Sequence, residues 1–151
     1  MSCVARPTRT FVEDYAVGLV KQSDACAALE KHFGCTYTEK DALATMDYES
    51  PLHYMEVKSR TCTYNDFNQT IIGNNKVLFA RTATKPCIFA FTFTDGSLYY
   101  IRYDPDKFSR YNVRRFRREA RADYTDLYKD YCYIPVRDLT CVIPPQPLFR
   151  S

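Results

Sequence analysis

Apolar side chains recur at helical spacing near the start of the chain. The recurring positions are Tyr15, Leu19, Cys26, Leu29 and Phe33. Because an α-helix turns once in about 3.6 residues, this spacing places them along one face and predicts a helix that begins at Phe11. The hydroxyl of Thr10 can cap its first turn, and Gly34 is a natural stop.

After residue 34 the pattern changes to short runs of apolar and β-branched residues. "ALATMDYES" and "YMEVKSR" predict two strands around a Ser-Pro turn. Gly73-Asn74 predicts the start of a second helix, with Val77, Leu78 and Ala80 as its apolar residues.

The clearest hairpin of the chain follows the second helix. "PCIFAFTF" and "SLYYIRYD" are its arms, and Asp95-Gly96 suits a tight turn with positive φ. Both arms are apolar on both faces, which predicts a buried position in the sheet. "YCYIPVRDL" predicts a late strand, and Pro135 favours the edge of the sheet for it.

The order helix, strands, helix, strands predicts an α/β or α+β fold with one mixed sheet. The length of 151 residues is typical of a single domain with a real core. No run of 18 apolar residues occurs, so no transmembrane helix is expected. The first ten residues lack the apolar stretch of a signal peptide, and the seven cysteines include no C-x-x-C pair. We therefore expect an intracellular protein with reduced thiols and no membrane partner.

The net charge of +3 is unevenly distributed. Residues 107–121 hold seven basic residues and one acid, a local charge of +6. Such a concentration indicates a surface that binds phosphates, and the interleaved Tyr111 and Phe116 suit a nucleic-acid groove. A solvated charged face is the alternative. The candidate phosphate contacts in this segment are Arg110, Arg114, Arg115, Arg117 and Arg118.

A pair of opposite charges lies within the predicted strand "YMEVKSR". Because side chains alternate along a strand, Glu56 and Lys58 point to one face while Met55 and Val57 point into the core. The predicted Ser-Pro turn between the two strands brings Asp47 back beside Glu56 and Lys58. Two carboxylates can hold Mg²⁺, and a lysine beside the ion can orient a water molecule and stabilise charge on a phosphate. This pattern predicts a site for phosphodiester hydrolysis, although Glu56 and Lys58 taken alone are better explained as an ordinary exposed ion pair.

Over roughly residues 11 to 104 the chain resembles the PD-(D/E)xK nuclease superfamily, which includes restriction endonucleases and Holliday-junction resolvases. The resemblance implies an αβββαβ core with a central mixed sheet flanked by helices. It implies that Asp47, Glu56 and Lys58 are catalytic, that Asp47 and Glu56 bind Mg²⁺ or Mn²⁺, and that the substrate is DNA. "YMEVKSR" is similar to the family's strand, which ends in an arginine (here Arg60), and "TIIGNNK" to the next helix, which places Lys76 near the site. Arg60 and Lys76 are then phosphate contacts.

The resemblance also implies one nuclease-like domain over residues 1–151, with a core at about 11–104 and a basic C-terminal extension at 105–151. A homodimer is compatible with it. One position departs from the family: where many members carry a metal-binding Glu on the first helix, this chain has Gln22. Glu13 or Glu30 replaces it only if the register differs.

Gln22 keeps a second interpretation open. In it, the chain is a catalytically inactive nuclease fold that serves as a nucleic-acid-binding or virion structural protein. A third interpretation is an unrelated α/β interaction module. His53 is a candidate general base, but strand alternation points it away from Glu56.

Overall fold

The computed structural model describes residues 11–41, 43–117 and 128–147. The helices are α1 (Phe11–Phe33), α2 (Asn74–Thr82) and α3 (Pro105–Phe108), with a 3-10 turn, η1, at Val136–Asp138. The strands are β1 (Thr38–Glu39), β2 (Tyr48–Glu49), β3 (Tyr54–Ser59), β4 (Gln69–Gly73), β5 (Cys87–Thr92), β6 (Leu98–Arg102), β7 (Val113–Arg117), β8 (Tyr128–Pro135) and β9 (Thr140–Ile143).

The strands of the described part of the chain form two sheets. The larger has the order β1-β2-β3-β5-β6-β9; β3 and β5 run parallel and the other neighbours antiparallel. The smaller is antiparallel, with the order β4-β8-β7. A mixed α/β fold is therefore confirmed, whereas the prediction of one sheet is wrong. β4 leaves the main sheet because its partner is β8, a strand some 60 residues further along the chain.

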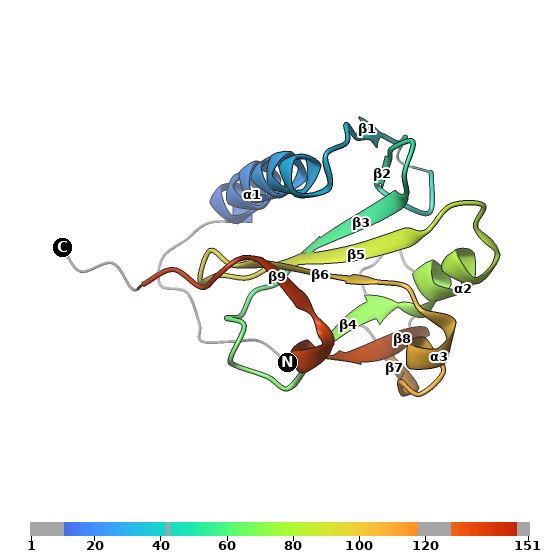
Figure 1. The fold of residues 1–151 in the computed structure, drawn as a ribbon. Coiled ribbons are helices and arrows are strands. Elements are labelled where there is room, and N and C mark those ends of the chain that lie inside the picture. The colour runs from blue at the N-terminus through green and yellow to red at the C-terminus, as the bar shows by residue number, and fades with distance from the viewer. Residues whose placement is uncertain (1–10, 42, 118–127, 148–151) are drawn as a thin grey trace.

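The six-stranded sheet is covered on both faces. On one face α1 packs Ala25 and Leu29 in one hydrophobic cluster with Met55 and Val57 of β3. Figure 1 shows α1 on this side and the smaller sheet with α2 on the other. That second layer packs its own buried side chains, from β4, α2 and β8, against Phe89 and Phe91 of β5. The face opposite α1 is thus covered largely by a sheet, and not by helices alone as expected.

The local signals of the sequence match the structure closely. α1 ends where Gly34 adopts a φ of +68°, and α2 begins at Asn74 directly after Gly73. Gly96 has a φ of +79° in the β5–β6 turn, as a tight hairpin turn requires. Every residue of β5 is buried, so the prediction of a buried hairpin arm is confirmed. Thr10, the expected cap of α1, lies outside the described residues.

The prediction that Pro135 marks an edge strand is wrong. β8 is the middle strand of the smaller sheet. β7 pairs with β8 only as far as Cys132, whereas β4 pairs with it up to Pro135. Pro135 therefore has a strand on one side only, where a missing N–H is tolerated.

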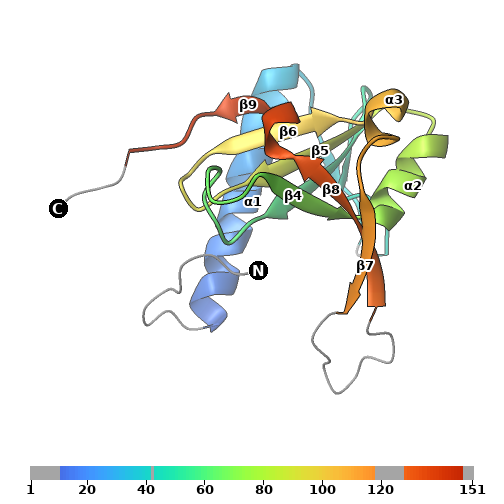
Figure 2. The ribbon, with the colours of Figure 1, turned by 90° about the horizontal axis from the view of Figure 1, so that it is seen from below.

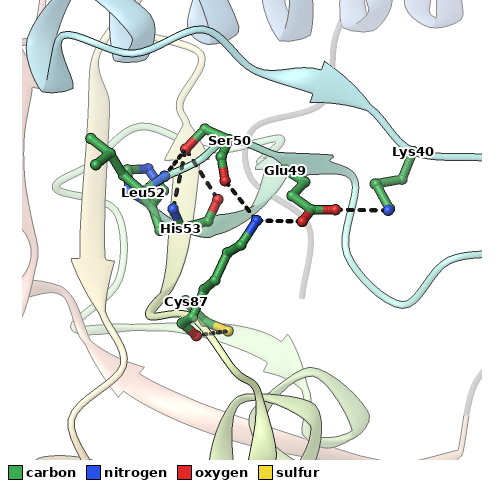
Figure 3. Close-up of polar contacts among 7 residues, drawn as sticks. Lys40, Glu49, Ser50, Leu52, His53 and Cys87 are labelled. Carbon is green, nitrogen blue, oxygen red and sulfur yellow. Dashed lines mark hydrogen bonds and ion pairs between the residues drawn. The ribbon is translucent and has the colours of Figure 1, made fainter.

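A network around Glu49 fixes the turn between β2 and β3 (Figure 3). The Ser50 hydroxyl oxygen accepts hydrogen bonds from the backbone N–H groups of Leu52 and His53, each 3.1 Å long. Glu49 lies between the ammonium groups of Lys40, at 2.8 Å, and Lys85. These bonds hold the pKa of Glu49 down at about 2. The short antiparallel pair that results sets Asp47, the residue before β2, beside β3.

Residues 105–147 contribute to both sheets, because β9 pairs with β6 and β8 pairs with β4. Within the arginine-rich segment, Val113–Arg117 form strand β7. β7 and β8 make a two-stranded arginine ribbon, defined here as residues 113–117 and 128–132. Figure 2 shows the two strands running side by side past α2. None of the described helices is long and apolar enough to cross a membrane.

Candidate active site at Glu56

Glu56 is buried in the middle of β3, with 1% of its surface exposed. The ammonium group of Lys58, two residues on, lies 3.0 Å from its Oε2, and that of Lys76, at the start of α2, lies 3.3 Å from the same oxygen. Lys76 also donates a hydrogen bond to the carbonyl oxygen of Thr45. Lys58 and Lys76 therefore both pair with the buried carboxylate.

Two further side chains meet β3 at Val57, on the edge that β2 leaves open. β2 pairs only with Tyr54 and Met55. Beyond that point, Asp47 Oδ2 accepts a hydrogen bond of 3.1 Å from the Val57 N–H. The side-chain amide of Gln22, in α1, donates one of 3.3 Å to the Val57 carbonyl oxygen. One group of side chains thus comes from α1, from the residue before β2, from β3 and from α2. It is called here the Glu56 cluster and consists of Gln22, Asp47, Glu56, Lys58 and Lys76.

The electrostatics of Glu56 oppose its ionisation. Burial raises the pKa of Glu56, Lys58 lowers it, and the nearby negative charge of Asp47 raises it again. Lys58 and Lys76 both lie against Oε2, whereas Oε1 has no hydrogen-bond partner among the described residues. A buried carboxylate oxygen without a donor is costly, and a cation that binds both Glu56 and Asp47 relieves that cost.

The donor set fits a hard divalent cation. Mg²⁺ prefers oxygen ligands and commonly uses one or two carboxylates, with water completing its coordination. Asp47 and Glu56 provide two, and the unpaired Oε1 of Glu56 is a free ligand atom. Among the described residues no group of three or more His, Cys, Asp or Glu side chains is placed to hold a metal ion. The two carboxylates would therefore be the acidic ligands.

Glu30, one of the other acidic candidates on α1, is bonded elsewhere. Glu30 Oε2 accepts a hydrogen bond of 2.8 Å from the backbone N–H of Tyr37, which ties it to the segment after α1. The side chain of Glu13 lies outside what the structure describes. Gln22 is thus the described α1 residue that hydrogen-bonds the Val57 carbonyl oxygen.

His53 lies on the opposite side of the sheet from Glu56. It is 1% exposed and packs against Phe33 and Tyr37, with a short hydrogen bond to the Tyr37 hydroxyl. Burial lowers the pKa of His53, so its imidazole is neutral at pH 7. It packs in the core and does not contact the Glu56 cluster.

The predicted arginine contacts whose side chains the structure describes are of three kinds. Arg110 and Arg114 are exposed, and the Arg114 guanidinium lies 5.3 Å from the ring centroid of Tyr133. Arg115 pairs with Asp130 of β8 at 2.9 Å, so an acid distant in the sequence partly balances the charge of this segment. Arg60 is mostly buried beside Phe91. The side chain of Arg117 and the whole of Arg118 lie outside the described residues.

Sequence reasoning missed the Thr45 carbonyl and the double role of Lys76. No local sequence pattern predicts the contact between Lys76 and the Thr45 carbonyl, because α2 and the residues before Asp47 are about 30 positions apart in the chain. Comparison with protein-family models, curated proteins and solved structures gives no match for this chain. The chain's own residues therefore carry any assignment of function.

Proposed function

We propose that this chain is a metal-dependent nuclease that hydrolyses phosphodiester bonds in DNA. One observation carries the proposal: Asp47 and Gln22 bond the backbone of Val57 at the open edge of β3. Val57 lies directly between Glu56 and its ion-pair partner Lys58 in the sequence. A carboxylate pair with a lysine beside it is the arrangement that metal-assisted phosphodiester hydrolysis needs.

The side chains divide the work according to their exposure. Asp47 and Glu56 would hold Mg²⁺ or Mn²⁺, which supplies a more acidic bound water and a polarised phosphate when present. Lys58 has 40% of its side chain exposed, so its ammonium can contact both a substrate phosphate and the attacking water. Lys76, 16% exposed, holds Glu56 in position and adds positive charge behind it.

The order of elements supports a restriction-endonuclease-like core. α1, β1, β2, β3, α2 and β5 follow one another as the αβββαβ arrangement requires, with β4 inserted between β3 and α2. The inserted strand pairs outside the main sheet. It therefore leaves β3 beside β5 and the Glu56 cluster between α1 and α2.

In this proposal DNA binds to the arginine ribbon and to the residues just before β7. Arg114, in β7, and Arg110, three residues before β7, are exposed cations. A two-stranded ribbon fits a nucleic-acid groove, and arginines bind phosphate oxygens with two parallel hydrogen bonds. Phosphate contacts of this kind give affinity without sequence preference.

A specific observation favours a second candidate, an inactive nuclease fold that binds nucleic acid. The Gln22 side chain is bonded as a donor to the Val57 carbonyl, so α1 brings an amide, a weaker metal ligand than a carboxylate, to the cluster. The substitution Q22E separates the two candidates. Cleavage that appears only in Q22E would assign the natural chain to binding.

The deciding experiment is cleavage of a panel of single-stranded, duplex and branched DNA with Mg²⁺ or Mn²⁺. We expect cleavage that EDTA abolishes and that K58A reduces by about 100-fold or more, because a preorganised cation at a transition state is worth about 3–4 kcal/mol. K40A is the matched control: Lys40 is similarly exposed at 37% and pairs with Glu49, outside the cluster. Equal activity in K58A and K40A would contradict the role of Lys58.

A further inference from the structure

A pocket of about 530 Å³ lies beside the C-terminal end of β3, and its volume is in the range of small-ligand sites. Residues 59–62, residues 67–71 and Tyr133 line it. This 59–71 pocket adjoins the Glu56 cluster along the chain. The backbone N–H of Arg60 donates to the Thr92 carbonyl, so the extended pairing with β5 continues to Arg60. Glu56 and Arg60 are thus about 13 Å apart along one face of the strand.

Arg60 brings to this pocket a cation that lacks a counter-charge. One of its terminal nitrogens donates to the Ile71 carbonyl oxygen, and its guanidinium lies 5.6 Å from the centroid of the Phe91 ring. Its Nε–H is buried and has no acceptor among the described residues, and none of their carboxylates lies within ion-pair distance of it. Burying a cation without an anion is unfavourable, so an anionic ligand is favoured here.

Thr70 supplies a second, independent donor. The residue is 6% exposed, and its hydroxyl has no hydrogen-bond partner among the described residues. Both Thr70 and Arg60 line the pocket. A hydroxyl and a guanidinium together suit the oxygens of a phosphate group. Phe67 and Tyr133, also in the lining, provide aromatic rings against which a base can stack.

We propose that the 59–71 pocket binds the phosphate of a nucleotide, with the Arg60 Nε–H and the Thr70 hydroxyl as donors and Phe67 and Tyr133 beside the base or sugar. The same chemistry is offered by a free mononucleotide and by the phosphorylated end of a strand. Binding here does not require a metal ion on Glu56. The inference therefore stands whether or not the Glu56 cluster cleaves DNA.

The test measures binding of a labelled single-stranded hexanucleotide in EDTA, in three forms: with a 5′-phosphate, with a 3′-phosphate, and with neither. A terminal phosphate at one of the two ends should tighten binding by about tenfold or more, the worth of a charge-assisted hydrogen bond. T70V should remove much of that gain, whereas T70S, which keeps the hydroxyl, should retain it. R60Q should abolish it, and K40A, which removes a lysine paired with Glu49 outside the pocket, should leave it unchanged.

T70V keeps the test decisive even if R60Q fails to fold. The Thr70 hydroxyl has no partner among the described residues, so its replacement by a methyl group should not lower the melting temperature. Equal binding of all three hexanucleotides to the wild type would overturn the proposal. So would a phosphate preference that survives unchanged in T70V.

Competition with thymidine monophosphate distinguishes the two sources of the ligand. If thymidine monophosphate displaces the phosphorylated hexanucleotide from the wild type but does not displace the hexanucleotide that T70V still binds, the pocket takes free nucleotides. If it fails to compete while the phosphate preference persists, the pocket takes strand ends. Either result supports a phosphate site at Arg60 and Thr70.

Discussion

Lys76 of α2 lies 3.3 Å from Oε2 of Glu56 in β3, and it also donates a hydrogen bond to the Thr45 carbonyl oxygen. One ammonium group therefore joins α2, β3 and the segment that leads to Asp47. Removing it would separate the two carboxylates from the helix and leave Glu56 with Lys58 alone. The position of the acidic pair thus depends on a residue outside the Glu-x-Lys motif.

K76M should destabilise the protein at pH 7 by about 3 kcal/mol, because it leaves a buried carboxylate with half of its counter-charge. Urea unfolding monitored by circular dichroism measures this change. K58M is the matched control and should cost less, since Lys58 is 40% exposed and Lys76 is 16% exposed. K76M should destabilise the E56Q protein by less than it destabilises the wild type. Additive effects of E56Q and K76M would show that the pair does not interact.

The metal-free protein should lose stability as the pH rises through the pKa of Glu56. Burial raises that pKa in the folded state above the unfolded value of about 4.3, so the folded state binds the proton more tightly. Unfolding free energy then falls with pH between the two values. Mg²⁺ should reverse the trend, because metal binding requires the ionised carboxylate. Thermal unfolding from pH 4 to 8, with and without Mg²⁺, tests this, and E56Q should show neither effect.

Glu49 should show the opposite dependence on pH. Lys40 and Lys85 hold its pKa at about 2 in the folded state, below the unfolded value of about 4.3. Its contribution to stability is therefore present above pH 4.3 and is lost as the pH falls toward 2. E49Q should be less stable than the wild type at pH 7, and the difference should narrow in acid. A constant difference from pH 7 to pH 3 would contradict the ion-pair account of this turn.

Replacing both Arg110 and Arg114 by alanine should weaken DNA binding for all sequences alike. If each arginine neutralises one phosphate, the slope of log affinity against log salt should fall by about 1.8 on duplex DNA. D130N offers the reverse change: it removes the 2.9 Å ion pair and one negative charge beside Arg115, and should tighten binding. Fluorescence anisotropy over a salt series measures both. An unchanged slope in the double substitution would assign the ribbon to a solvated face.

The sequence predicted what depends on neighbouring residues. Gly34 and Gly96 marked a helix end and a turn because both positions need positive φ. Strand alternation correctly placed Met55 and Val57 in the core, where the structure packs them against α1. The pairing of β4 with β8 left no local signal, since it depends on contacts between distant parts of the chain. For the same reason the burial of Glu56 and its second lysine, Lys76, could not be read from the Glu-x-Lys spacing.

The most direct measurement is the binding of Mn²⁺, followed by electron paramagnetic resonance, to the wild type, D47N, E56Q and K40A. A catalytic ion held by Asp47 and Glu56 predicts saturable binding in the wild type and in K40A, and a loss of about tenfold or more in affinity in D47N and E56Q, as expected when a carboxylate ligand is removed. The result does not depend on knowing the DNA substrate. Wild-type protein that binds no Mn²⁺, or binding that survives unchanged in both D47N and E56Q, would contradict the proposed metal site and with it the proposed nuclease.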